Sequence, residues 1–82
     1  MGRETFGTRF KHARSLSGFT QNEAATAIAV HSQTISEWER DVLVRLPPAE
    51  ILRKASVALG VHFMWLAFGE GKPPRRSDVR AS

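Results

Sequence analysis

Apolar side chains recur at helical spacing near the start of this 82-residue chain. Phe6, Phe10 and Ala13 fall at i, i+4 and i+7, which places their side chains on one face of a helix. Gly18 follows, and glycine often closes a helix because it adopts a left-handed backbone without strain. The pattern therefore predicts a first helix over residues 5–17.

The stretch over residues 20–40 predicts two short helices with a tight corner between them. Thr20 and Glu23 have the spacing of a capping box, in which each side chain accepts from an unpaired backbone N–H group. The first of these helices should therefore begin at Gln21. An Ala-Val-His segment interrupts the apolar spacing, which resumes in the second helix. The inward positions are Ala24, Ala25 and Ile28 in the first helix and Ile35 and Trp38 in the second.

The second of these helices carries polar side chains on the face opposite its apolar positions. Gln33, Ser36, Glu37 and Arg40 fall at i, i+3, i+4 and i+7, and core packing requires none of them. A helix that is held by one face and presents hydrogen-bonding groups on the other suits contact with base edges of DNA. The simpler interpretation is an ordinary solvated helix face.

Two further helices are predicted in the second half of the chain. Pro47 and Pro48 exclude a continuing helix and favour the first turn of a new one, which we expect over residues 48–59. Gly60 should end it, and a short apolar segment over residues 61–68 predicts a fifth helix. The inward positions of the fourth helix are Leu52, Ala55 and Leu59.

Composition narrows the class of protein without deciding it. The net charge of +4 suits a nucleic-acid partner, but residues 1–45 carry six basic and five acidic side chains, so the sequence shows no dense basic patch. The absence of cysteine excludes disulfides and thiolate metal sites, and no apolar run approaches the roughly 20 residues of a membrane span. We expect a soluble, cytoplasmic domain over residues 1–70 with a flexible basic tail over 71–82.

Several separated stretches, in the same order, resemble the helix-turn-helix proteins of the phage Cro and lambda-type repressor (XRE-like) family. They are FGTRFKHAR, then TQNEAATAIAV with TISEWE, then ALGV and WLAFGEG, and together they span about residues 5–70. The resemblance implies an all-α, five-helix lambda-repressor-like domain whose second and third helices form the helix-turn-helix. It also implies a transcriptional regulator of the repressor type in a bacterial or phage-infected cell. Such a protein binds double-stranded DNA with paired half-sites as a homodimer, which can be weak.

The resemblance also assigns roles to individual residues. It implies base-edge contacts from the third helix, phosphate contacts from the start of the second helix, and a contact of Thr34 with a thymine methyl or a phosphate. Arg40 and Arg45 would contact the DNA backbone. The base-edge residues are Ser32, Gln33, Ser36 and Glu37, and the phosphate residues are Gln21 and Asn22.

Two further expectations concern an internal ion pair and the apolar residues of the fifth helix. In the resembling family an arginine at the position of Arg14 pairs with a glutamate at the position of Glu39, so we expect an internal salt bridge between them. The fifth helix has more apolar residues than a core this small needs. Trp65 and Leu66 should point inward, while Met64 or Phe68 joins a two-fold interface.

The chain departs from the family pattern at positions that shape the backbone. Ala29 stands at the corner where the family has glycine, which should cost about 1 kcal/mol of strain. His31 replaces the serine that caps the third helix, so that helix begins at one of two neighbouring residues. Asp41 replaces a common glycine in the following loop. Gly7, inside the first helix, suggests close packing there.

Other function classes have less support. No clustered nucleophile and base indicates an enzyme, and His12, His31 and His62 lack metal-ligand spacing, so we expect neither cofactor nor metal, and no small-molecule ligand. His31, at the corner, could face a phosphate. A helix-turn-helix protein-interaction module, or a controller or antitoxin-type partner protein, is the main alternative. Because the chain ends soon after the domain, we expect a small Cro-like protein, an isolated N-terminal repressor domain or a controller protein.

Overall fold

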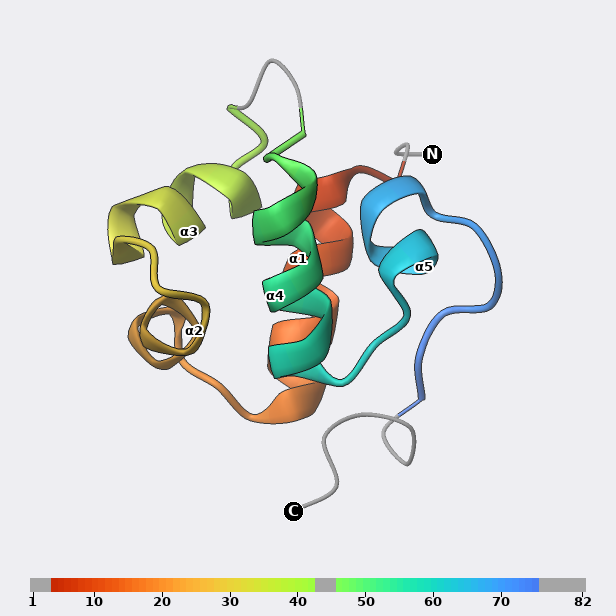
Figure 1. Ribbon diagram of the computed structural model, residues 1–82, viewed down its shortest axis with the longest axis horizontal. Helices are drawn as coiled ribbons and strands as arrows, with labels where there is room; N and C mark the ends of the chain where they lie inside the picture. Colours follow the sequence, from red (N-terminus) through yellow and green to blue (C-terminus); the bar gives the residue numbers. More distant parts are fainter. Residues whose placement is uncertain (1–3, 43–45, 76–82) are drawn as a thin grey trace.

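Five α-helices make up the fold in the computed structural model, which describes residues 4–42 and 46–75 (Figure 1). The described residues contain no β-strand, so the expectation of an all-α, five-helix domain is confirmed. The predicted boundary between a domain over 1–70 and a tail over 71–82 stays a prediction. The helices are α1 (Phe6–Ser17), α2 (Gln21–Ile28), α3 (Ser32–Glu39), α4 (Ala49–Leu59) and α5 (Phe63–Phe68).

The local capping signals of the sequence appear as hydrogen bonds. The capping box of α2 is complete, since the Glu23 backbone N–H donates to Thr20 Oγ1 at 3.0 Å and the Thr20 N–H donates to Glu23 Oε1 at 2.9 Å. Gly18 ends α1 in the left-handed conformation, at φ 80°, and its N–H donates to carbonyls of the last turn. These contacts fix the entry and exit of helices that are too short to be stable alone.

Three helix starts lie later than the sequence pattern suggests. The first helix begins at Phe6 because Thr5 is its cap, and α4 begins at Ala49 because Pro48, at ψ 152°, is not helical. The fifth helix was predicted from residue 61 but begins at Phe63. The reason is that the Val61 N–H donates back to Ser56 O at 3.0 Å, so this residue completes the C-terminal turn of α4.

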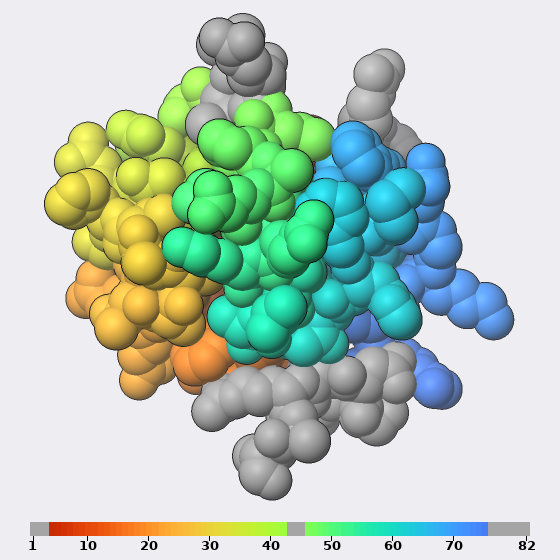
Figure 2. All heavy atoms as spheres, in the orientation of Figure 1, coloured from red at the N-terminus to blue at the C-terminus, as the bar shows by residue number. Residues whose placement is uncertain are grey.

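The core is continuous and joins all five helices. Trp38 of α3 lies edge-on against two rings of α1, with centroid distances of 5.2 Å to Phe10 and 5.5 Å to Phe6. Figure 2 shows α4 in the middle of one face of the molecule, between the α2–α3 pair and α5. The buried core side chains are Phe6, Phe10, Ala13, Ala24, Ala25, Ile28, Ile35, Trp38, Leu52, Ala55, Leu59, Trp65, Leu66 and Ala67.

Gly7 marks the closest approach of α1 to the end of α3. A Cβ atom at this position would overlap the Trp38 carbonyl oxygen and Asp41 Oδ1, so no larger residue fits without movement of the backbone. Asp41 has the left-handed φ of 59° that the glycine of the family pattern would adopt easily, and its Oδ1 accepts from Thr5 Oγ1 at 2.7 Å. The loop after α3 therefore closes onto the start of α1.

Arg9 holds α5 against α1, a role that the sequence analysis missed. Its side chain is buried, and Nε donates to Leu66 O at 2.9 Å while Nη2 donates to Ala67 O at 3.0 Å. Carbonyls in the last turn of a helix lack intrahelical partners, so a cation satisfies both the hydrogen bonds and the helix dipole. One signal was available: Arg9 lies on the same helical stripe as Phe6 and Ala13, which predicts burial of the charge.

Within the described residues, no helix is long and apolar enough to cross a membrane.

Candidate nucleic-acid interface

One face of α3 packs in the core, and the opposite face is accessible to solvent. Ile35 and Trp38 are buried, whereas Ser32 and Gln33 are exposed. The predicted positions Thr34, Ser36 and Glu37 are half-buried. The helix begins at Ser32 with His31 as its cap residue, and no side-chain cap bond is made there. No side chain therefore caps the backbone N–H groups in the first turn of α3, the turn that begins with Ser32 and Gln33.

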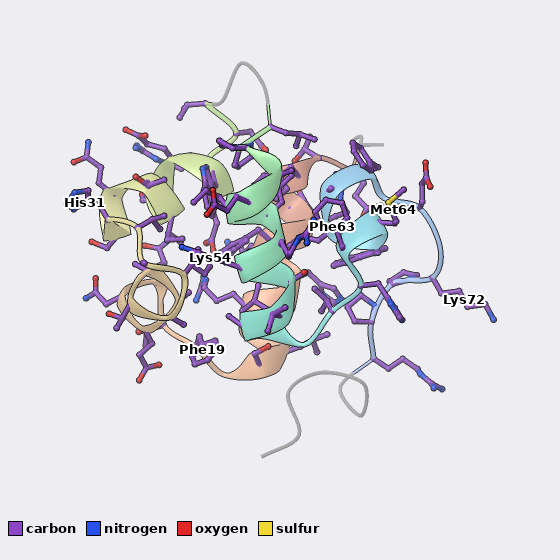
Figure 3. The ribbon with its side chains drawn as sticks, viewed as in Figure 1. Phe19, His31, Lys54, Phe63, Met64 and Lys72 are labelled. Carbon is purple, nitrogen blue, oxygen red and sulfur yellow. The ribbon has the colours of Figure 1, made fainter. Side chains whose placement is uncertain are left out.

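The corner between α2 and α3, which sets the direction of α3, has the strained backbone expected from the sequence. Ala29 closes α2 in the left-handed conformation, with φ 68° and ψ 45°, and its N–H donates to carbonyls of the last turn. An L-residue with a Cβ atom pays about 1–2 kcal/mol to adopt this conformation. Figure 3 places His31 at the outer end of this corner, and its side chain is exposed.

An open groove lies between the N-terminal ends of α2 and α3. It has a volume of about 480 Å³ and brings together residues from three consecutive helices, α1, α2 and α3. Five of the predicted DNA contacts line it, so the structure gathers the start of α2 and the polar face of α3 into one surface. The lining residues are Arg14, Thr20, Gln21, Asn22, Ser32, Gln33 and Ser36.

Arg14 and Glu39 form the expected ion pair beneath this groove. Arg14 Nε donates to Glu39 Oε2 at 2.6 Å and Nη2 donates to Oε1 at 2.9 Å, a two-pronged geometry that suits the planar guanidinium. Arg14 Nη1 also donates to Phe19 O at 2.8 Å. The side chains are 15% and 5% exposed, respectively. Hydrogen bonding to Glu39 raises the pKa of Arg14, while burial opposes the shift, so the guanidinium stays charged at any physiological pH.

Gln21 joins the ion pair to the surface of the groove. Its Nε2 donates to Glu39 Oε1 at 3.1 Å, and the residue is half-buried at the first position of α2. The sequence analysis assigned Gln21 to a phosphate and did not foresee this second contact. The spacing of 18 residues gives no periodic signal, because the contact depends on how the corner folds α3 across the end of α2.

The polar face of α3 has one internal hydrogen bond between described side chains, and three of its predicted DNA contacts lie outside the groove. Gln33 Nε2 lies 3.4 Å from Glu37 Oε2, a long hydrogen bond between neighbours one helical turn apart. Arg40 is exposed at the C-terminal cap of α3, and neither it nor Thr34 nor Glu37 lines the groove. Arg45 was predicted to contact the DNA backbone but lies outside the described residues.

The outer face of α5 lies on the opposite side of the fold from the corner at His31 (Figure 3). Met64 and Phe68 are 46% and 54% exposed, while Trp65 and Leu66 are buried as the sequence predicted. The Phe68 ring meets the half-buried Phe63 ring edge-on at 6.4 Å between centroids. Phe63, Met64 and Phe68 therefore form an apolar patch on the outer face of α5.

In the described part of the chain, no three His, Cys, Asp or Glu side chains are grouped so as to hold a metal ion.

Comparisons with known proteins agree with the fold. The sequence model of a family described as helix-turn-helix matches residues 10–66. The structure is similar to the solution structure of the DNA-binding domain of the P22 C2 repressor, with a TM-score of 0.72 and 23% sequence identity over 94% of this chain and 99% of that chain. At that identity the similarity establishes the fold. No curated protein gives a significant match to the sequence.

Proposed function

Because this chain belongs to the helix-turn-helix family, whose members are DNA-binding regulators, we propose that it is a sequence-specific transcriptional regulator of the phage-repressor type. One observation carries the proposal: the polar side of α3 and the first turn of α2 meet in one groove. The opposite side of α3 is fixed in the core through Ile35 and Trp38. A reading helix needs this combination, since its position must be rigid and its polar atoms must be accessible.

The exposed and half-buried polar side chains of α3 supply the reading chemistry. Gln33 can pair through two hydrogen bonds with an adenine, and Glu37 can accept from a cytosine amino group. The hydroxyl groups of Ser32 and Ser36 can donate to or accept from a base edge. Thr34 offers a methyl group to thymine or a hydroxyl to a phosphate. The contact between Gln33 and Glu37 holds these two side chains near each other before DNA arrives.

The remaining residues of the interface hold the DNA backbone. Gln21 and Asn22 occupy the first turn of α2, where N–H groups without intrahelical partners and the positive end of the helix dipole favour a phosphate. Arg40 is an exposed cation at the end of α3, and Arg45, for which we propose the same role, lies outside the described residues. Such contacts fix the register of the protein on the duplex without reading its sequence.

We also propose that two copies associate through the α5 patch of Phe63, Met64 and Phe68. One reading helix contacts only a few base pairs, so specific sites usually combine two half-sites about one helical turn apart. A two-fold arrangement buries the same patch from both copies. The α5 patch lies on the far side of α4 from the groove, so its burial leaves the groove accessible (Figures 1 and 3).

Affinity titrations separate the reading role from the holding role. The DNA probe is a duplex selected from a random library, with a scrambled duplex for comparison, at several salt concentrations. Gln33→Ala should lose about 1–3 kcal/mol on the selected duplex only, because it removes a base contact. Arg40→Ala should weaken binding to both duplexes and lower the salt slope by about one unit.

The matched control is Arg53→Ala, which removes the same charge from the exposed side of α4, outside the groove. It should leave the salt slope within error of the parent. Equal weakening of both duplexes by Gln33→Ala would remove the base-reading role. A parent protein that binds no duplex even at low salt would favour the protein-interaction alternative, for which the α5 patch is the available surface.

Sedimentation tests the association through α5. Phe68→Asp places a charge in the patch and should weaken self-association and cooperative binding to paired half-sites. Val57→Asp is the matched control, because Val57 is 76% exposed on α4 and a charge there should change neither property. If Phe68→Asp associates like the parent, the interface lies on another surface.

A further inference from the structure

We propose that Glu39 is a positioning residue for DNA binding, in addition to its part in the ion pair. It fixes the side-chain amide of Gln21 so that this amide meets a DNA phosphate in the correct orientation. The inference rests on the proposed function, because it assumes that Gln21 contacts a phosphate. It explains why that contact is favourable through Glu39 and Arg14, which are not proposed to touch DNA.

The orientation of the Gln21 amide follows from the chemistry of its partner. A carboxylate only accepts hydrogen bonds, so the amino group of Gln21, and not its carbonyl oxygen, must face Glu39. The distance from Gln21 Nε2 to Glu39 Oε1 is 3.1 Å. Glu39 is itself held in place, since its side chain is 5% exposed and both of its oxygens accept from Arg14. The amide is therefore tied to a fixed point.

The second N–H of the same amino group remains for the groove. Gln21 lines the groove together with Asn22, Ser32 and Gln33, at the first position of α2. A phosphate oxygen also only accepts hydrogen bonds, so a phosphate and Glu39 each require an N–H donor from Gln21. One amino group with two donors can satisfy both. A glutamate at this position could satisfy neither, because it has no donor when ionised.

Without Glu39 the amide would lose this advantage. A glutamine side chain in water samples several rotamers, and a reversed amide would turn its carbonyl oxygen towards the phosphate. Ordering such a side chain on binding weakens affinity by about two- to tenfold. Arg14 is also needed, because it balances the negative charge of Glu39 close to the phosphate. The ion pair thus prepares the groove for an anion.

The test is a thermodynamic cycle on the affinity for the selected duplex. Gln21→Met keeps the length of the side chain and removes its amide. It is measured in the parent and in an Arg14→Met/Glu39→Leu background, where an apolar pair replaces the ions. We expect about a tenfold loss in the parent and less than about threefold in that background. Gln33→Met is the matched control, since its amide contacts Glu37 instead, and its loss should be equal in both backgrounds.

Each outcome decides between the possibilities. Equal losses from Gln21→Met in both backgrounds, or no loss in either, would overturn the positioning role. A Gln21 that only completes the hydrogen bonding of Glu39 would lower the melting temperature of Gln21→Met without changing the affinity of the folded protein. A parent that binds no duplex would instead refute the proposed function.

A second measurement does not need the double variant to fold. In the uncomplexed parent, the ¹⁵N relaxation of the Gln21 side-chain amide should resemble that of the backbone of α2, while that of Asn22, exposed beside it, should show faster motion. A Gln21 amide as mobile as that of Asn22 would overturn the inference without any reference to DNA.

Discussion

Loss of either member of the Arg14–Glu39 pair should destabilise the fold, and the two losses should be unequal. Arg14→Met leaves the Glu39 carboxylate 5% exposed, with Gln21 as its one remaining described side-chain donor. Breaking a buried pair in this way typically costs 3–5 kcal/mol, because the remaining charge is desolvated without a partner. We expect about 3 kcal/mol or more.

The reverse change should cost less. Glu39→Leu strands Arg14, but that side chain is 15% exposed and keeps its hydrogen bond from Nη1 to Phe19 O. A long guanidinium can also reach water while its stem stays packed. We therefore expect about 2 kcal/mol. The double variant Arg14→Met/Glu39→Leu should recover part of the loss, since no charge remains buried.

Urea unfolding at neutral pH measures these free energies from the transition midpoint, provided that the slope m is unchanged. For a domain of this size, about 3 kcal/mol corresponds to a fall in melting temperature of roughly 12–24 °C. Neutral pH is the correct condition. The folded-state pKa of Arg14 is raised, so the stabilisation linked to it is fully present below the ordinary arginine pKa and is lost only in strongly alkaline solution. Single variants that unfold like the parent would show that the pair is solvated, and the reasoning would fail.

Two backbone positions give simpler predictions. Gly7→Ala should destabilise by about 1–3 kcal/mol, because its methyl group would overlap the Trp38 carbonyl, whereas Lys11→Ala on the exposed side of the same helix should have little effect; equal melting of the two variants would refute the close approach. Ala29→Gly should stabilise by roughly 0.5–1 kcal/mol, since relief of about 1–2 kcal/mol of left-handed strain exceeds the added entropy of the unfolded chain. A lower melting temperature for Ala29→Gly would contradict that balance.

The parts of the fold that the sequence predicts well are those with local causes. The capping box at Thr20 and the closure at Gly18 depend on residues within one turn, so their spacing is visible in the chain. The apolar stripe of each helix is equally local. The start of α5 was misplaced by two residues, because a bond from Val61 back to α4 competes with helix formation and leaves no periodic trace.

The polar contacts that complete the molecule could not be predicted in the same way. Periodicity shows which side of a helix is buried, but it does not show which partner a buried polar group meets. Arg9 reaches carbonyls 57 and 58 residues away, and Gln21 reaches Glu39 across the corner. The Arg14–Glu39 pair was expected only through family resemblance. These contacts depend on tertiary geometry, which the helical pattern alone does not fix.

The distribution of these contacts explains how a short helix can be both rigid and accessible. Contacts with α1 and its cap residue hold the C-terminal end of α3 and Asp41, the second residue after it. They join Gly7 to Trp38, Arg14 to Glu39 and Thr5 to Asp41. The N-terminal half of α3, with Ser32 and Gln33, instead borders the open groove. A helix-turn-helix protein reads bases with the N-terminal residues of its second helix. Because α3 is anchored at its C-terminal end, Ser32 and Gln33 at its N-terminal end remain uncovered. The buried Arg14–Glu39 ion pair fixes the end of the helix opposite to them.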